Sequence, residues 1–325
     1  MTIKHNGLIV IGENFNTTRK IKGSSPRVIQ DGGGVRLTYT DLDGSIGALD
    51  ITGIFPKEPD EQKNYQIPHI AQALRDGDMA YMTWIVKNQE AKGAHIIDVC
   101  VDEISHWPEE RMKWMQTAVK TVQGITDKPL PLDSSDGETI RAGLEVYDRE
   151  LSRPAINSVN LEVPRLPLIA MAKEYDAILF ANAGGVSSMP ANDVERFENL
   201  SKLMDMMDDA GIAMDDRYLD PLVFPIGAGP EFGNHYLDAV RTLRKNYPEV
   251  HIFGGHSNVS FGLPGRKILN NAFISLSILA GCDSVMIDPV MNPVLNSVEF
   301  KLATDVLTAA DEYSVKYIKY WRKKS

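Results

Sequence analysis

The chain has 325 residues, 43% of them hydrophobic, and its 34 basic and 44 acidic residues give a net charge of −10. This length and apolar content are enough for a large core in one α/β barrel domain. The acidic balance argues against nonspecific binding to a nucleic-acid backbone, which requires a positive surface.

The sequence gives no sign of a membrane or secreted protein. Its apolar runs stay shorter than the roughly 18 residues that a transmembrane helix needs, and residues 1–6 lack the apolar core of a secretory signal. The two cysteines, Cys100 and Cys282, are too few for a disulfide framework or a cysteine-rich zinc site. We therefore expect a cytoplasmic protein that does not bind membranes.

The first predicted element is a strand over residues 8–13, and an irregular region follows it. Residues 17–66 show no helical pattern, but Asp31-Gly32-Gly33-Gly34 and Asp43-Gly44-Ser45 bound alternating segments. Such Asp-Gly pairs between alternating segments predict β-hairpins. Because this insertion follows a strand, it should emerge where the strands of a barrel end, as a surface decoration, a lid or a partner-docking loop.

From residue 68 onward, amphipathic and apolar segments alternate regularly. In the first helical segment, 68–92, apolar Ile70, Leu74, Met82 and Ile85 recur at spacings near three and four. Strands are predicted at 8–13, 94–100, 129–133, 154–158, 177–182, 217–223, 250–255 and 284–288. Helices are predicted at 68–92, 107–123, 137–150, 165–175, 192–210, 233–246, 265–281 and 296–320, the last of which could be two helices.

This alternation predicts the fold. Eight strands and eight helices in turn are typical of a (β/α)8 TIM barrel, here as one domain over 1–325 with the insertion at 17–66. An open doubly wound sheet is the alternative. It usually has a glycine-rich turn after its first strand, and no such turn follows residue 13.

Polar side chains end five of the predicted strands. They are Asp98, Asp133, Asn157, Asp220 and Asn258. Each one alone is more typical of a helix N-cap than of a ligand contact. In a parallel barrel, however, the carboxyl ends of all strands meet at one mouth, so the five should surround one cavity.

The chemistry of this set favours a flat, neutral heterocycle. Asn157 and Asn258 offer both donors and acceptors, whereas ionised Asp98, Asp133 and Asp220 only accept hydrogen bonds. Such a set matches a ring with an amino group, a ring N–H and a carbonyl. A phosphorylated ligand would instead require arginine, lysine and backbone N–H groups, and few basic side chains are expected at the mouth.

Other chemistries have little support. The histidines form no His-Glu-x-x-His or His-x-His arrangement, so we expect no metal site. Nucleophilic catalysis is also disfavoured, because no Gly-x-Ser-x-Gly occurs and Cys100 is more typical of a core residue. His256, which precedes Ser257 and Asn258, is more typical of a core residue than of a contact to substrate or partner.

Five segments resemble the pterin-binding methyltransferases, and in particular the methyltetrahydrofolate:corrinoid protein methyltransferases. They are Gly12-Glu13-Asn14-Phe15-Asn16, Leu132-Asp133-Ser134-Ser135, Ala155-Ile156-Asn157-Ser158, Tyr218-Leu219-Asp220-Pro221-Leu222 and Ser257-Asn258-Val259-Ser260. The resemblance covers residues 8–16 and 68–310. It implies a TIM barrel that holds a pterin at its mouth.

The resemblance also implies roles for individual residues. Asp133, Asn157 and Asp220 would hydrogen-bond the pterin ring. Asn258 would bind the pterin near N5, the atom that carries the methyl group, and would be the catalytic residue.

Further implications concern the cavity floor, the cofactor and the partner. Glu13 and Asp98 correspond to floor residues of the pterin site. The substrate would be tetrahydrofolate or methyltetrahydrofolate, although the proposed contacts do not distinguish it from tetrahydromethanopterin. Corrinoid-binding modules usually carry Asp-x-His-x-x-Gly, which is absent here, so the corrinoid (cobalamin) would arrive on a separate corrinoid protein. Loops 17–66 and 225–234 are candidates for its docking, and the family implies a homodimer.

Two other functions stay open at this stage. A dihydropteroate synthase-like enzyme would condense a pterin diphosphate with an aminobenzoate, and Arg266 and Lys267 could bind the diphosphate. A non-catalytic pterin-binding subunit of a methyl-transfer complex would need the cavity alone.

Overall fold

Eight parallel strands form a nearly closed barrel in a computed structural model that describes residues 7–308 and 310–323. The strands are β1 (Ile9–Asn16), β7 (Ile96–Cys100), β8 (Pro131–Asp133), β9 (Ala155–Val159), β10 (Ile178–Asn182), β11 (Arg217–Asp220), β12 (His251–Ile252) and β13 (Ser284–Ile287). Their order is β12-β11-β10-β9-β8-β7-β1-β13. The ends are joined after β12, where Met286 N donates to Gly254 O at 3.1 Å. The predicted TIM barrel is confirmed.

Alternation along β1 shows how the strands build two cores. Ile9 and Ile11 belong to the cluster inside the barrel, which is filled by aromatic residues such as Phe180. Leu8 and Val10 pack outward in the cluster shared with α9 and α10. Successive side chains of a strand point to opposite faces, which gives each strand one face for the barrel interior and one for the helices.

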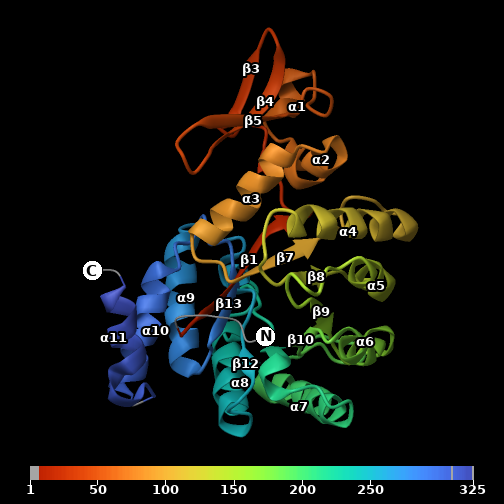
Figure 1. The fold of residues 1–325 in the computed structure, drawn as a ribbon. Helices are drawn as coiled ribbons and strands as arrows, with labels where there is room; N and C mark the ends of the chain where they lie inside the picture. Colours follow the sequence, from red (N-terminus) through yellow and green to blue (C-terminus); the bar gives the residue numbers. More distant parts are fainter. Residues whose placement is uncertain (1–6, 309, 324–325) are drawn as a thin grey trace.

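Helices surround the barrel (Figure 1). They are α2 (His69–Asp76), α3 (Met79–Ala91), α4 (Pro108–Gln123), α5 (Gly137–Glu145), α6 (Pro167–Tyr175), α7 (Asp193–Asp209), α8 (Phe232–Asn246), α9 (Arg266–Ala280), α10 (Leu295–Leu307) and α11 (Val315–Arg322). Short 3-10 turns are η1 (Val163–Arg165), η2 (Met214–Asp216), η3 (His256–Ser260) and η4 (Glu312–Ser314). The long C-terminal segment 296–320 proves to contain two helices, α10 and α11.

The helix predicted at 68–92 is wrong in one respect, because it is two helices. Gly77 ends α2 in the left-handed conformation, with φ of 65°. Asp78 then starts α3, where its side chain accepts a hydrogen bond from Tyr81 N. A left-handed glycine followed by an aspartate cap stops one helix and begins another, although the apolar spacing continues through both.

The insertion forms the predicted hairpins. Its elements are β2 (Ile21–Lys22), β3 (Val28–Asp31), β4 (Gly34–Thr40), β5 (Ile46–Asp50), α1 (Pro59–Gln62) and β6 (Gln66–Ile67). Strands β3, β4 and β5 make an antiparallel sheet, which stands above α2 and α3 at the top of Figure 1. Tyr39 of β4 lies 5.2 Å from Tyr81 and 4.8 Å from Trp84 between ring centroids. These contacts seat the small sheet on α3.

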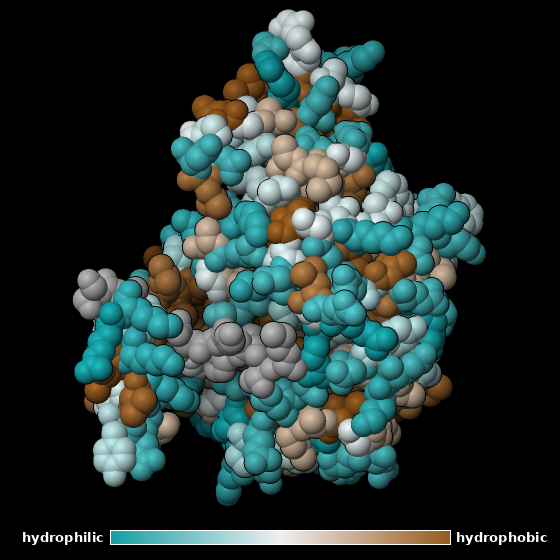
Figure 2. All heavy atoms as spheres, in the orientation of Figure 1, coloured by the Kyte–Doolittle hydropathy of each residue, from teal (hydrophilic) through white to brown (hydrophobic). Residues whose placement is uncertain are grey.

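The surface seen in Figure 2 is mostly hydrophilic, with hydrophobic side chains in scattered patches. Among the helices of the described ranges, none combines the length and apolar character that crossing a membrane requires.

Candidate pterin site at the barrel mouth

A cavity of about 380 Å³ opens at the carboxyl ends of β1 and β7 to β10. Its walls include Asn16, Asp102, Asp133, Ser134, Ser158, Arg165 and Asn182. Each of these residues lies at the end of a strand or in the loop that follows it. This is the face at which TIM-barrel enzymes place their active sites.

Three of the predicted residues gather on adjacent strands beside this cavity. Asp98 of β7 is buried, and its Oδ1 accepts a hydrogen bond of 3.1 Å from Asn157 Nδ2. Asp133 stands directly opposite Asn157 in the register of β8 and β9. Residues far apart in the sequence thus form one polar group, although Asp133 is the member of it that lines the cavity.

Burial changes the protonation of this group. Burial, together with the nearby Asp133 charge, raises the pKa of Asp98 well above its ordinary value. Burial also raises the pKa of Asp133 to about 7, with the Asp102 charge adding to the rise and the Arg165 guanidinium opposing it. At neutral pH a carboxyl of this group can therefore carry a proton and donate a hydrogen bond, which a fully ionised set cannot do.

Asp220 lies at the end of β11 in a similar environment. Burial raises its pKa to about 7. One carboxyl oxygen, Oδ1, accepts a hydrogen bond of 2.8 Å from Leu222 N. Its strand neighbour is Asn182 of β10, which lines the cavity. Asp220 is thus next to the cavity wall and partly engaged with its own loop.

Asn258 is on η3, where its side chain is exposed. The preceding Ser257 donates from Oγ to Glu13 Oε1 at 3.0 Å. Arg266 Nη2 donates to the Ser257 carbonyl oxygen at 2.8 Å. Two side chains from different elements therefore hold the loop that carries Asn258 beside β1.

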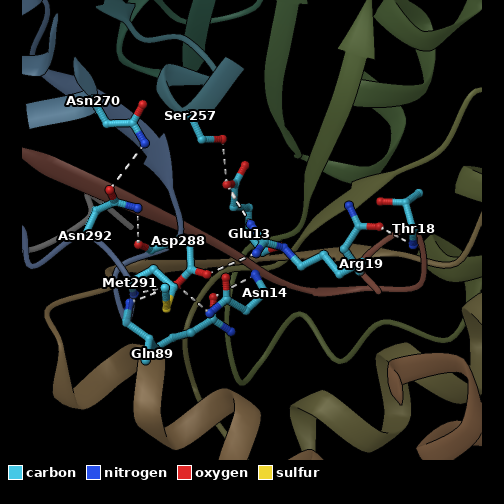
Figure 3. Close-up of polar contacts among 12 residues, drawn as sticks. Glu13, Asn14, Thr18, Arg19, Gln89, Ser257, Asn270, Asp288, Met291 and Asn292 are labelled. Carbon is cyan, nitrogen blue, oxygen red and sulfur yellow. Dashed lines mark hydrogen bonds and ion pairs between the residues drawn. The ribbon is translucent and has the colours of Figure 1, made fainter. Parts of the chain in front are cut away.

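Glu13 belongs to a network that closes this side of the mouth, shown in Figure 3. Its Oε1 also accepts from Arg19 Nη2 at 2.7 Å, and Arg19 Nη1 contacts Asp288 Oδ2 at 3.0 Å. Asn14 Nδ2 donates to Asp288 Oδ1 at 2.9 Å. A chain of contacts thus runs from η3 through β1 and the first residues of the insertion to the loop after β13.

His256 is a core residue. It has no exposed surface, and its ring packs against Tyr236 and Phe273. Its Nδ1 lies 2.7 Å from the Gly254 carbonyl oxygen. Burial lowers the pKa of His256 to about 4, so the ring is neutral at physiological pH.

The structure groups the predicted residues in three places. Asp98, Asp133 and Asn157 form one group, and Asp133 also lines the cavity. Asp220 stands one strand beyond Asn182. Glu13 and the Asn258 loop meet through Ser257.

Sequence reasoning missed several polar residues of the mouth. Asn182 ends β10 and obeys the same strand-end rule as the others, so it was detectable. Asp102 accepts from Ser134 Oγ at 2.5 Å across two loops. Arg165 donates to the carbonyl oxygens of Ser134 and Ser158, and with Arg19 it makes the mouth more basic than expected. No pattern in the sequence indicates either arginine.

The described residues contain no group of three or more histidine, cysteine, aspartate or glutamate side chains arranged to hold a metal ion.

The comparisons with known proteins agree with this geometry. The family described as pterin binding enzyme matches residues 71–288, which is more than half of the chain. The chain therefore belongs to the pterin-binding enzyme family.

Individual proteins of known name are also similar to this chain. The chain is 31% identical over 273 residues to methylcorrinoid:tetrahydrofolate methyltransferase of Eubacterium limosum, covering 81% of this chain and 95% of that protein. It is 32% identical over 218 residues to methionine synthase of Mycobacterium tuberculosis, covering 62% of this chain but only 18% of that protein. A crystal structure of dihydropteroate synthase from Clostridium difficile, obtained in the presence of pteroic acid, matches with a TM-score of 0.55 at 17% identity, covering 94% of this chain and 98% of that one. That last likeness shows the shared barrel fold alone.

Proposed function

We propose that the chain is a methyltransferase that moves a methyl group between N5 of tetrahydrofolate and the cobalt of a separate corrinoid protein. The observation that carries this proposal is the 31% identity to a methylcorrinoid:tetrahydrofolate methyltransferase across 81% of this chain and 95% of that one. The name of that relative favours transfer toward tetrahydrofolate, as in a catabolic demethylation pathway.

In this proposal the polar group on β7 to β9 holds the pterin ring. Asp133 accepts from the amino and ring N–H groups, and Asn157 offers both a donor and an acceptor. Asp98 orients the Asn157 amide through their 3.1 Å hydrogen bond. A protonated Asp98 leaves Asp133 as the carboxylate that accepts from the ring, which limits the buried negative charge that an uncharged heterocycle has to compensate.

Asp220 also hydrogen-bonds the ring in this proposal, and Asn258 acts near N5. A methyl group on a tertiary amine is a poor electrophile, so its departure requires positive charge at N5. The Asn258 amide oxygen can accept a hydrogen bond from protonated N5 while remaining neutral. A contact that strengthens only as this charge develops stabilises the transition state more than the ground state.

The corrinoid is a reactant brought by the partner. When it is bound, it supplies the cobalt that gives or takes the methyl group, which is the difficult part of the chemistry. The chain's own residues bind and orient the pterin at an open mouth. No protein nucleophile is required. Cys100 lines the cavity, but burial raises the pKa of its thiol well above the ordinary value, which keeps the thiol protonated.

The test is spectroscopic. The isolated chain is mixed with reduced free cobalamin or with a corrinoid protein, together with methyltetrahydrofolate, and the cobalt absorbance is followed. We expect formation of the methylated corrinoid and the reverse reaction with tetrahydrofolate. Binding of methyltetrahydrofolate without any turnover, with a validated partner present, would favour a non-catalytic pterin-binding subunit instead.

The dihydropteroate synthase-like alternative gains no support from the site. It requires basic side chains available to a diphosphate. Of the two candidates for that role, Lys267 is exposed on α9 and does not line the cavity. Arg266 instead donates to the Ser257 carbonyl oxygen and, at 3.0 Å, to Ser260 Oγ. It therefore holds η3.

A further inference from the structure

A second cavity of about 380 Å³ lies outside the candidate pterin site. It is bounded by the start of the insertion, by α3 and by the loop after β13, and it shares no lining residue with the first cavity. The first residues of the insertion supply its basic side chains, and α3 supplies Trp84 and Ile85. It is therefore a feature of this insertion as much as of the barrel.

The charge of this cleft is positive. Arg19, Lys20 and Arg27 line it, against a single carboxylate, Asp288. Asp288 is fully engaged, since it accepts from Arg19, from Asn14 and from two backbone N–H groups of its own loop. Among the cations of the cleft, Asp288 pairs with Arg19 and makes no ion pair with Lys20 or Arg27.

Among the three cations of the cleft, Arg27 is held by a backbone carbonyl oxygen and an aromatic ring. Its Nε donates to the Thr38 carbonyl oxygen at 2.7 Å, and its guanidinium carbon lies 5.2 Å from the centre of the Trp84 ring. Within the described ranges it pairs with no carboxylate, whereas Lys20 pairs with the half-exposed Glu103 at 3.0 Å. A stacked guanidinium of fixed orientation is well suited to bind a carboxylate.

The pKa of His69 is affected by the same three cations. It begins α2, is buried and lines the cleft. Burial, with the charges of Arg27, Arg19 and Lys20 adding to it, lowers the pKa of His69 to about 3. The three cations and His69 line the same cleft, and the neutral histidine adds no further charge to it.

The remaining wall is apolar. Ile21, Trp84, Ile85, Val290 and Met291 line it. A hydrated inorganic ion would gain nothing from such a wall, whereas an aromatic or aliphatic body would bury apolar surface against it.

We propose that this cleft binds a small organic anion, with its carboxylate on Arg27 and Lys20 and its apolar body against Trp84 and Ile85. Arg19 lines the cleft and also holds Glu13, so the bound anion lies against the network that fixes η3. The site is separate from the pterin cavity, and its existence does not depend on the proposed methyl transfer.

Isothermal titration calorimetry at constant ionic strength tests this with three probes. Benzoate has both the charge and the apolar body, benzyl alcohol has the body alone, and inorganic phosphate has the charge alone. We expect saturable binding of benzoate at one site, with at least tenfold weaker binding of benzyl alcohol and of phosphate. Absence of saturable benzoate binding, or tighter binding of phosphate than of benzoate, would overturn the proposal.

Variants locate the site. Arg27→Gln should weaken benzoate binding at least tenfold. Arg149→Gln is the matched control, because Arg149 also lies over an aromatic ring, that of Tyr175, but lines neither cavity. Equal affinity in the two variants refutes the assignment. Circular dichroism checks folding, and if Arg27→Gln does not fold, Lys20→Gln takes its place, with the same weakening expected and the same refuting result.

Discussion

Replacing Glu13 by glutamine should loosen the loop that carries Asn258. The Glu13 carboxylate is the meeting point of β1, Arg19 and η3, with contacts of 2.7 Å to Arg19 and 3.0 Å to Ser257. Glutamine keeps the size and one acceptor oxygen but loses the charge. The variant therefore tests the charge-assisted network rather than packing.

The size of the effect follows from these contacts. A hydrogen bond to a charged group contributes about 1.5–3 kcal/mol to stability. The side chains of Arg19 and Glu13 are 30% and 16% exposed, and Arg19 retains Asp288, so we expect a loss of about 1–2 kcal/mol. With about 2 cal/mol/K of unfolding entropy per residue, a chain of this length should lose about 1.5–3 °C in Tm. Misplacement of Asn258 should lower kcat about tenfold, which corresponds to about 1.4 kcal/mol in the barrier.

Thermal unfolding and the cobalt absorbance assay measure the two effects. Glu103→Gln is the control, because Glu103 forms a comparable 3.0 Å pair with Lys20 but is 55% exposed. An exposed pair of that kind contributes at most about 1 kcal/mol. If Glu13→Gln matches Glu103→Gln in both Tm and kcat, the network does not position η3.

Three other changes probe the mouth. Asn258→Ala should lower kcat for methyl transfer at least tenfold while changing the Kd for methyltetrahydrofolate by less than about threefold; unchanged turnover in stopped-flow measurements would refute the catalytic role. Because the pKa of Asp133 is about 7, calorimetric affinity for methyltetrahydrofolate should rise as the pH increases from 6 to 8, and Asp133→Asn should reduce that dependence, leaving the part that belongs to Asp220. Burial raises the pKa of Asp220 from 3.8 to about 7. The protonated carboxyl therefore contributes at most about 4 kcal/mol to the stability of the ligand-free protein. This contribution is complete below about pH 4 and is lost as the pH rises through 7. Urea unfolding of Asp220→Asn should therefore show a smaller decrease in stability between pH 5 and pH 8 than the wild type, and parallel decreases would contradict the buried carboxyl.

The barrel and part of its site could be predicted because their signals are local and periodic. Apolar strands that end in aspartate or asparagine mark the carboxyl end of each strand, and the closed parallel sheet brings these ends together. The pairing of Asp133 with Asn157 follows directly from adjacent strands in register. The hairpins of the insertion were visible for a similar reason, since Asp-Gly turns and alternation are short-range features.

Contacts between distant side chains left no such signal. Arg19 reaches Glu13 and Asp288 only because β1 and β13 are neighbours in the closed barrel, although 269 positions separate Arg19 from Asp288. Arg165 in η1 likewise donates to the carbonyl oxygens of Ser158 on β9 and of Ser134 in the loop after β8. The protonation of the buried carboxyls could not be predicted for another reason. A pKa depends on burial and on neighbouring charges, and both follow from the folded structure rather than from the sequence.

Protonation explains how an acidic protein can use an acidic cavity. If Asp98, Asp133 and Asp220 were all ionised, the mouth would repel a folate, whose glutamate tail is itself negative. Burial instead raises the pKa of all three, that of Asp98 well above its ordinary value and those of Asp133 and Asp220 to about 7, and Arg165 offsets part of the remaining charge. A pterin that offers its amino and ring N–H groups would stabilise the ionised forms only when it is in place. In the proposed site, ionisation of the carboxyls strengthens pterin binding, and pterin binding stabilises the ionised carboxylates. Recognition then depends on the hydrogen-bond donors of the pterin ring rather than on the net charge of the ligand.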